Sequence, residues 1–404
     1  MASGDQQSVA ISADGTRGRV DASPEEVGID ASKLDWIRKH IGDDIERGVS
    51  DGSIIIVARH GKVVMHEAIG FSDRPNGRKA RVDDVLPIMS IAKQHTAMLA
   101  LKWIDRGHFA INSRVADIIP EFAQKGKERV TVRDLMSHQA GLPMQHPFEH
   151  FGAGNERYVE ILCETPYEPA PEGQVLYHAG AAHAVLGEMV RRCDPQGRPL
   201  RRIMHEEIYV PLGMRDSALT FIDRPDLQAR TTPAFMRGDG PDALSSDDVQ
   251  RVAEIAARVE FAAGGVFSTA YDEFLLAEML RLGGALNGNR VLSPAIIKAA
   301  TTNQTGNKIH GLFKEVCEKA GVEPFPAYLG LSLYLRGEGL LLTNMGTLMS
   351  RSGFAGSGFG GQLFAVDPER DLTFVQLVVG FPTLLRSRMR SQRFSDLVIS
   401  SVVN

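Results

Sequence analysis

The protein has 404 residues, of which 43% are hydrophobic and 24% are charged, with a formal net charge of −5. This length predicts two or three domain-sized units, or one large domain with an insertion, in a globular chain. The small negative charge gives no electrostatic reason to expect binding to nucleic acid or to an anionic membrane. No apolar run approaches the roughly 18 residues that a membrane span requires.

Three cysteines, Cys163, Cys193 and Cys317, are widely spaced in the chain. Their small, odd number argues against a disulfide framework and favours a reducing compartment. The first residues contain neither a basic stretch nor an apolar stretch of the kind found in secretory signals. We therefore expect a cytoplasmic protein.

The first third of the chain predicts a helix followed by a hairpin. Residues 1–23 are polar and rich in Gly, Ser and Asp, which predicts a flexible segment. A helix should follow, with Leu34, Ile37 and Ile41 on one face. Residues 53–59 and 63–70 then predict two antiparallel strands around a turn.

From about residue 103 to residue 262 the pattern is mainly helical, and after Gly330 it changes to short strands. Strands are expected at residues 331–335, 340–343, 362–366 and 372–379, and a closing helix at 384–402. Strands at both ends predict an α+β fold, an α/β sandwich whose antiparallel sheet is built from both termini and flanked by helices. Residues 24–102 and 263–404 would form this α/β domain, with a helical domain inserted at 103–262.

Ser90 is the first candidate for chemistry, because Lys93 follows it one helical turn later. Apolar residues recur at helical spacing from Ile91, so Ser90 should start a helix. A desolvated lysine amine can take the proton of a serine hydroxyl, and backbone N–H groups at a helix start can stabilise an oxyanion. The alternative is a helix-capping serine followed by a solvated lysine.

Several stretches together resemble the serine β-lactamase and penicillin-binding-protein superfamily. They are residues 90–93, 135–143, 211–214, 263–269 and 360–370, in the order in which that family has them. The resemblance is strongest to the class C-like branch, which contains family VIII-type carboxylesterases, D-aminopeptidases and transesterases. It implies a β-lactamase/transpeptidase-like fold, a Ser90 nucleophile and a Lys93 base.

The second motif of the family, Tyr-x-Asn after a Pro-Gly turn, is matched here at Tyr177. The resemblance implies that Tyr177 shares the proton transfers with Lys93, whose ammonium would lower the pKa of the phenol. The alternative is a core tyrosine at a helix start. Ala179 stands where the family usually has Asn, which argues against β-lactam turnover.

The third motif, on the strand beside the cleft, aligns with residues 356–358. Gly356 takes the place of the usual Lys or His, and Ser357 and Gly358 follow it. We expect these residues to bind substrate, and the Phe359 N–H to form the oxyanion hole with the Ser90 N–H. The alternative is a glycine-rich hairpin without a catalytic part. Arg351 is a nearby cation that could compensate for the missing Lys or His.

The twelve histidines do not indicate a metal site. His146 and His150 have suitable spacing, but Pro147 argues against a regular helix and no further ligands accompany them. His178 could hydrogen-bond substrate or replace the lost Asn, or make an ordinary polar contact. His138 is expected to be architectural. No metal and no cofactor are predicted.

The sequence therefore predicts a serine hydrolase that acts on a small-molecule ester or amide through a Ser90 acyl-enzyme. An acyltransferase of a biosynthetic pathway is the first alternative, and a non-catalytic binding protein of the same fold is the second. The acyl pocket should draw on residues 144–160, 221–262 and 303–328. The substrate's identity and the oligomeric state are left open.

Overall fold

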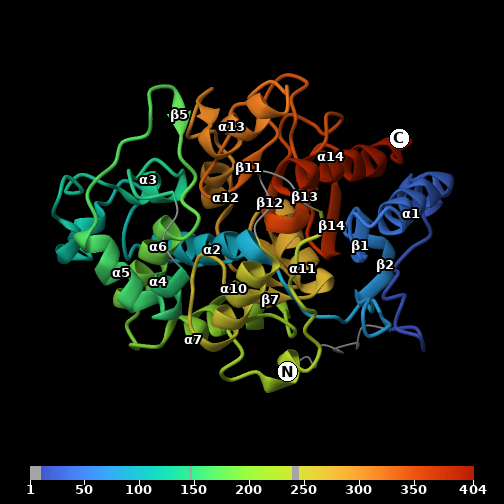
Figure 1. Ribbon diagram of the computed structural model, residues 1–404, viewed down its shortest axis with the longest axis horizontal. Coiled ribbons are helices and arrows are strands. Elements are labelled where there is room, and N and C mark those ends of the chain that lie inside the picture. Colours follow the sequence, from blue (N-terminus) through green and yellow to red (C-terminus); the bar gives the residue numbers. More distant parts are fainter. Residues whose placement is uncertain (1–10, 145–147, 239–244) are drawn as a thin grey trace.

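The protein is described by a computed structural model that covers residues 11–144, 148–238 and 245–404. Residues 1–10 of the segment predicted to be flexible, residues 1–23, lie outside these ranges. Figure 1 shows β1 and β2 of the N-terminal part beside β14 of the C-terminal part. The two ends of the chain thus meet in one sheet, as the sequence predicted.

The main sheet has seven strands in the order β11-β12-β13-β14-β1-β2-β3, and all of its neighbours are antiparallel. The strands are β1 (Gly52–Arg59), β2 (Lys62–Asp73), β3 (Arg78–Lys79), β11 (Tyr334–Leu335), β12 (Phe354–Gly358), β13 (Gln362–Asp367) and β14 (Leu372–Val379). Central strands β1 and β14 pair from Gly52↔Val379 to Arg59↔Leu372. Every residue of both strands is buried, because helices cover both faces of the sheet.

The two faces of the sheet have separate cores. Ile55 and Val57 pack with α1 (Ala31–Glu46) and α14 (Leu384–Ser400) on the outer face. Ile54 and Ile56 belong to the larger core, which contains α2 (Ala92–Asp105) and α11 (Ala270–Arg281). Alternate side chains of one strand therefore serve opposite cores.

The middle of the chain is mainly helical, as expected. Its helices are α3 (Val132–Met136), α4 (Phe148–Gly152), α5 (Asn155–Glu164), α6 (Ala181–Arg192), α7 (Leu200–Met204), α8 (Val210–Leu212), α9 (Pro225–Gln228) and α10 (Ser246–Arg258); α12 (Pro294–Ala300) and α13 (Gly311–Lys319) follow later. Helix α6 packs against both α2 and α5. The larger core runs through both parts of the chain, so the domain boundaries near residues 102 and 263 stay a prediction.

Three small sheets complete the fold of the described residues. They are β4 (Leu86–Pro87), β7 (Val266–Ser268) and β6 (Ala218–Leu219) in one sheet, β5 (Gln174–Val175) with β10 (Ile309–His310), and β8 (Ala285–Leu286) with β9 (Asn289–Arg290). Within the described ranges, no helix combines the length and the apolar composition needed to cross a membrane.

The strand predicted at residues 340–343 is wrong, and the one predicted at 331–335 is reduced to Tyr334–Leu335. At residues 340–348, contacts with α14 take the place of strand pairing. The Thr343 N–H donates to Gln392 Oε1 at 3.1 Å, and the Leu348 N–H donates to Asp396 Oδ1 at 2.8 Å. Helix side chains thus satisfy backbone groups that a strand would satisfy through a neighbour.

Candidate active site

Ser90 lies in a short 3₁₀ turn, Met89–Ile91, directly before α2. The turn follows β4, and Met89 adopts a φ of 51°, in the left-handed region that non-glycine residues rarely occupy. This backbone conformation requires support from its surroundings and is common at functional sites. It leads the chain from the β4 strand into α2 at the edge of the pocket described below.

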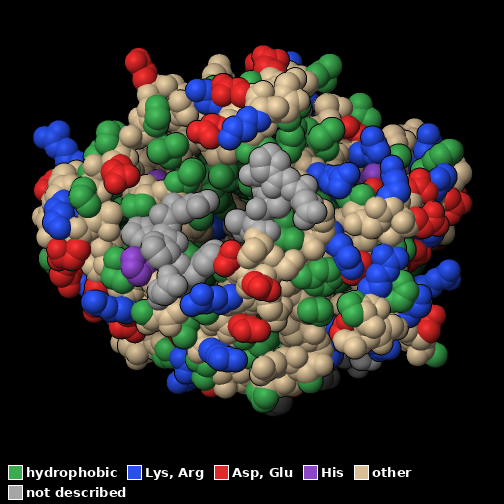
Figure 2. Space-filling view, viewed as in Figure 1, with side chains coloured by type: hydrophobic (Ala, Val, Ile, Leu, Met, Phe, Trp, Pro, Cys, Tyr) green, Lys and Arg blue, Asp and Glu red, His purple; other side chains and the backbone are tan. Residues whose placement is uncertain are grey.

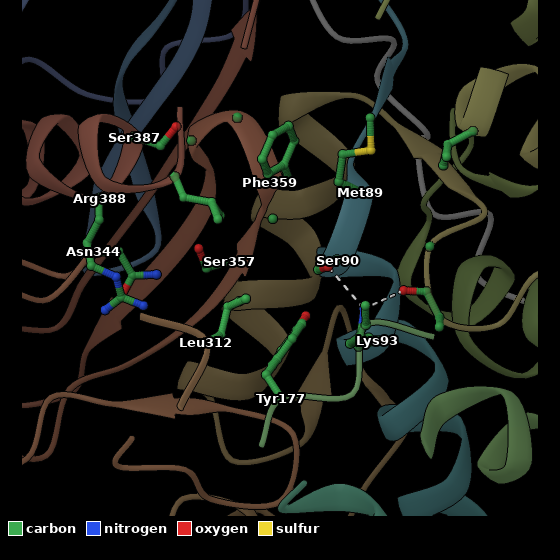
Figure 3. A pocket seen from close by; sticks show the side chains of 18 of the residues that line it. Met89, Ser90, Lys93, Tyr177, Leu312, Asn344, Ser357, Phe359, Ser387 and Arg388 are labelled. Carbon is green, nitrogen blue, oxygen red and sulfur yellow. Dashed lines mark hydrogen bonds between the residues drawn. The ribbon is translucent and has the colours of Figure 1, made fainter. Parts of the chain in front are cut away.

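Lys93 is directed at Ser90 from the first turn of α2. Its Nζ lies 3.0 Å from Ser90 Oγ and donates to the Ala263 carbonyl at 2.8 Å (Figure 3). The side chain is 2% exposed, and this burial lowers the pKa of Lys93 to about 7. The alternative of a solvated lysine is therefore wrong. A large share of the amine is neutral at neutral pH and can accept a proton from Ser90.

Tyr177 follows β5, and its hydroxyl points toward Ser90 (Figure 3). Burial and the neighbouring Tyr334 raise the pKa of Tyr177 well above its usual value, although its hydrogen bond with Ser90 lowers it. The expectation of a lowered pKa is therefore wrong, because the loss of water on burial outweighs the hydrogen bond with Ser90. At neutral pH Tyr177 keeps its proton.

The end of β12 approaches Ser90 closely. A Cβ atom on Gly358 would lie 2.4 Å from the Ile88 carbonyl oxygen and 3.3 Å from the Ser90 nitrogen. Only glycine permits this approach, which places the following Phe359 peptide beside Ser90. Ser357, Gly358 and Phe359 line the pocket, and their binding of substrate stays a prediction.

Gly356 and His178 do not line that pocket. A Cβ atom on Gly356 would lie 2.3 Å from the ring of Phe364, so this position faces the core. His178 is 1% exposed, and its backbone N–H donates to Nδ1 of His138 at 3.0 Å. The expectation that His178 touches substrate is not supported. The His178 N–H instead links the backbone beside Tyr177 to the His138 ring. This contact agrees with the structural role expected for His138.

The pocket in front of Ser90 has a volume of about 260 Å³. Figure 2 shows a hollow near the middle of this face, with hydrophobic side chains on its rim. Each of the three ranges predicted for the acyl pocket contributes to its wall. These contributions are Met144 and Phe151; Val249, Val252 and Phe261; and Leu312 and Phe313.

Sequence reasoning missed several polar residues of the pocket, among them Tyr334, Asn344 and Arg388. Figure 3 shows Asn344 and Arg388 at the end away from Lys93. Arg351, the cation considered from the sequence, is 79% exposed, and its nearest acidic partner is Glu338 at 3.7 Å. It is absent from the described pocket wall.

The described residues contain no group of three or more His, Cys, Asp or Glu side chains that could hold a metal ion. His146, one of the two histidines weighed for such a site, lies outside the described residues. The pocket wall instead combines a serine hydroxyl, an amine and a phenol, which is a set suited to acyl transfer.

The sequence profile of the beta-lactamase family matches residues 37–393. The chain belongs to the beta-lactamase family. A similar solved structure is a penicillin-binding-protein homologue from Caulobacter crescentus, with 25% identity, a TM-score of 0.75, and coverage of 93% of this chain and 99% of that chain. This family membership confirms the resemblance and the fold that the sequence predicted.

Two further solved structures share the beta-lactamase fold. EstCE1, described as a hydrolase with promiscuous acyltransferase activity, has 18% identity, a TM-score of 0.72, and coverage of 90% of this chain and 98% of that chain. A family VIII carboxylesterase has 21% identity, a TM-score of 0.73, and coverage of 92% of this chain and 99% of that chain. The fold is thus one on which esterases occur.

Proposed function

We propose that the protein is a serine esterase that hydrolyses a small-molecule ester through a Ser90 acyl-enzyme. The observation that carries this proposal is the Lys93 amine, which is buried, has a pKa near neutrality and lies 3.0 Å from Ser90 Oγ. Burying an amine without a carboxylate costs stability, so its position beside a hydroxyl has a functional explanation.

In the acylation step, neutral Lys93 takes the proton of Ser90 as Oγ attacks the ester carbonyl carbon. The Ser90 and Phe359 N–H groups would hold the oxyanion. When the tetrahedral intermediate collapses, Tyr177 gives its proton to the leaving alkoxide and takes one from the Lys93 ammonium. The raised pKa of Tyr177 suits this relay, because the phenol is protonated before and after it.

Deacylation reverses these roles. Tyr177 and neutral Lys93 would take a proton from the attacking water, and the proton would return to Ser90 Oγ when the acid product leaves. The three residues end the cycle in their starting protonation states. The reaction needs no metal or cofactor to balance its protons.

The walls of the pocket favour an ester over a β-lactam. Ala179 lines the pocket where the family usually has Asn, and Gly356, which aligns with the family's Lys or His, faces the core and gives the pocket no cation. Apolar side chains form much of the wall, which suits a short apolar acyl chain. A small amide is the second type of acyl donor that this arrangement suits.

Acyl transfer to an alcohol or amine is a second candidate function. EstCE1, which shares the fold, is described as having promiscuous acyltransferase activity. The same Lys93–Tyr177 relay could take a proton from an acceptor hydroxyl instead of water. A non-catalytic binding protein is less favoured, because the buried Ser90–Lys93 contact would then have no use.

Burst kinetics with p-nitrophenyl butyrate test the proposed function. We expect a burst from the wild type, none from Ser90→Ala, and much slower acylation in Lys93→Met and Tyr177→Phe. Ser387→Ala is a matched control, because Ser387 also lines the pocket but its hydroxyl donates to the Pro382 carbonyl. The burst should remain in this control.

Two further experiments distinguish the proposed esterase from a non-catalytic binding protein and from an acyltransferase. A fluorophosphonate probe that labels neither wild type nor Ser90→Ala would favour a binding protein. An added alcohol that speeds p-nitrophenol release and gives the acylated alcohol would favour an acyltransferase.

A further inference from the structure

A second cavity lies between α7 and β6, apart from the pocket in front of Ser90. Its volume is about 220 Å³, and the described walls of the two cavities share no residue. One side is lined by α7 and by the π-helical turn that follows it, His205–Tyr209. The other side is lined by β6 and by residues that flank it, as far as Arg224. Turns of π-helix are rare and occur frequently at functional sites, so this cavity is a candidate for a second binding site.

Arginine side chains reach this cavity from both sides. Arg201 and Arg202 come from α7, and Arg224 comes from the opposite segment. His205 adds an imidazole, and Asp223 is the only acidic residue of the described wall. Three guanidinium groups and one carboxylate give this wall a positive charge, which favours an anion as the ligand.

Ion pairs fix the positions of two of these arginines. Arg201 donates to Asp223 through Nε at 2.7 Å and to Glu260 through Nη1 at 2.9 Å. Arg224 donates to both carboxylate oxygens of Asp226, through Nε at 3.0 Å and through Nη2 at 2.7 Å. Among the described residues, Nη2 of Arg201 and Nη1 of Arg224 have no hydrogen-bond partner. Both cations are therefore held in place, and each keeps a nitrogen available to a ligand.

The floor of the cavity contains an unpaired backbone N–H. Strand β6 is an edge strand, because its sheet has the order β4-β7-β6. The Thr220 N–H donates to the Gly265 carbonyl, so Leu219 and Val266 face each other without hydrogen bonds between them. The N–H and C=O of Leu219 therefore point away from β7. Leu219 lines the cavity and is 2% exposed, and its N–H has no partner in the described part of the chain. Burying such a donor is costly, and a ligand oxygen would remove that cost.

We propose that this second cavity binds inorganic hydrogen phosphate. The free guanidinium N–H groups and the Leu219 N–H would donate to its charged oxygens. The wall also offers two acceptors for its hydroxyl, the Leu219 carbonyl and the Asp223 carboxylate. Sulfate and dianionic phosphate esters lack that hydroxyl and would place an anionic oxygen against these acceptors. The site does not depend on the proposed esterase, because it uses none of the residues around Ser90.

Calorimetric titration of the protein at about pH 8 tests this selectivity. Phosphate, sulfate and methyl phosphate are then dianions, because the second pKa of a phosphate ester is about 6, and only phosphate keeps a hydroxyl. We expect saturable phosphate binding with a Kd of about 1 mM or lower, and binding at least about 10-fold weaker for the other two anions. Absence of saturable phosphate binding, or equal affinity for the three anions, would overturn the proposal.

Arg202→Gln and Arg224→Gln should each weaken phosphate binding by about 10-fold or more, because each removes a charge-assisted contact. The Arg202 side chain is 63% exposed and pairs with Glu206 one helical turn away, so its replacement should leave the fold intact. Thermal unfolding of each variant measures this.

Two further variants are controls. Arg157→Gln removes an arginine that is 62% exposed and also pairs with an acidic residue one turn away, Glu160 on α5. Arg388→Met removes the buried arginine of the pocket in front of Ser90. Both variants should keep the wild-type affinity for phosphate. A loss in Arg388→Met with unchanged binding in Arg202→Gln would place the anion in the Ser90 pocket and contradict the second site.

NMR of protein labelled with ¹⁵N-leucine locates the bound anion. The Leu219 amide resonance, assigned by its absence in Leu219→Ile, should shift as phosphate is added, with the Kd that calorimetry gives. A direct hydrogen bond causes this shift, whereas a general effect of ionic strength would appear equally with sulfate. A Leu219 resonance that does not move at saturating phosphate, or full affinity in folded Arg202→Gln and Arg224→Gln, would overturn the proposed site.

Discussion

The Nζ atom of Lys93 lies 3.0 Å from Oγ of Ser90, and the Ala263 carbonyl accepts a second hydrogen bond from the same amine at 2.8 Å. The carbonyl fixes the direction of the amine, and burial removes the water that would keep it charged. Together they orient an uncharged amine at the hydroxyl that it must deprotonate.

The pH dependence of acylation should follow Lys93. The base form is lost when the amine is protonated, so kcat/KM for p-nitrophenyl butyrate should rise tenfold per pH unit below pH 7 and level off above it. Stopped-flow kinetics from about pH 5 to about pH 9 measure this profile. A rate that is independent of pH through this range would contradict a Lys93 base.

Tyr177→Phe should lower kcat by about 10²- to 10⁴-fold, the usual contribution of a group that transfers protons. Because the phenol returns a proton to the leaving alkoxide, the loss should be larger for alkyl esters than for p-nitrophenyl esters, whose leaving group needs little protonation. Comparing kcat for ethyl butyrate and p-nitrophenyl butyrate in both proteins measures this difference. An equal loss for the two esters would exclude the relay to the leaving group.

Lys93→Met should stabilise the fold, most strongly at low pH. The pKa of Lys93 is about 7 in the folded protein and 10.5 in its unperturbed state, so between these values the unfolded chain binds the extra proton. The wild type's free energy of unfolding should thus rise relative to that of the variant by up to about 1.4 kcal/mol per pH unit in this window. Chemical denaturation of both proteins at several pH values measures the difference. Parallel curves would show that the amine is not buried as described.

Gly358→Ala should lower activity by about 10²- to 10³-fold, comparable with the loss of one oxyanion donor. Its added Cβ would collide with the Ile88 carbonyl and move the Phe359 peptide away from Ser90. Gly42→Ala is the control, because Gly42 lies within α1 and an added Cβ meets nothing within 4 Å. It should keep full activity and gain about 0.5–1 kcal/mol in stability. Steady-state kinetics and thermal unfolding of both variants test this, and unchanged activity in Gly358→Ala would exclude the close approach.

The sequence predicted the parts of the site that lie in short motifs. Ser90 and Lys93 are three residues apart on one helical face, so their meeting is a local property of the chain. Tyr177 follows a Pro-Gly turn in the expected order of motifs, and the structure directs its hydroxyl at Ser90. Strands β1, β2, β13 and β14 of the sheet were also predictable, because their residues show period-two or largely apolar patterns.

The remaining features depend on contacts between distant segments. The burial of Arg388 depends on rings from α13, from the segment after it and from β11, none of which has a fixed spacing from α14. Asn344 lies in a segment without regular structure. The apolar residues just before it, at 340–343, wrongly predicted a strand there. The direction of the Tyr177 pKa shift depends on the degree of desolvation, which a sequence pattern does not reveal.

The most direct test of the central claim is mass spectrometry of the protein quenched during turnover of p-nitrophenyl butyrate. The account predicts one butyryl group on the wild type, located by peptide mapping at Ser90, and none on Ser90→Ala. A butyryl group on any other residue, or turnover of the ester that persists in Ser90→Ala, would contradict it.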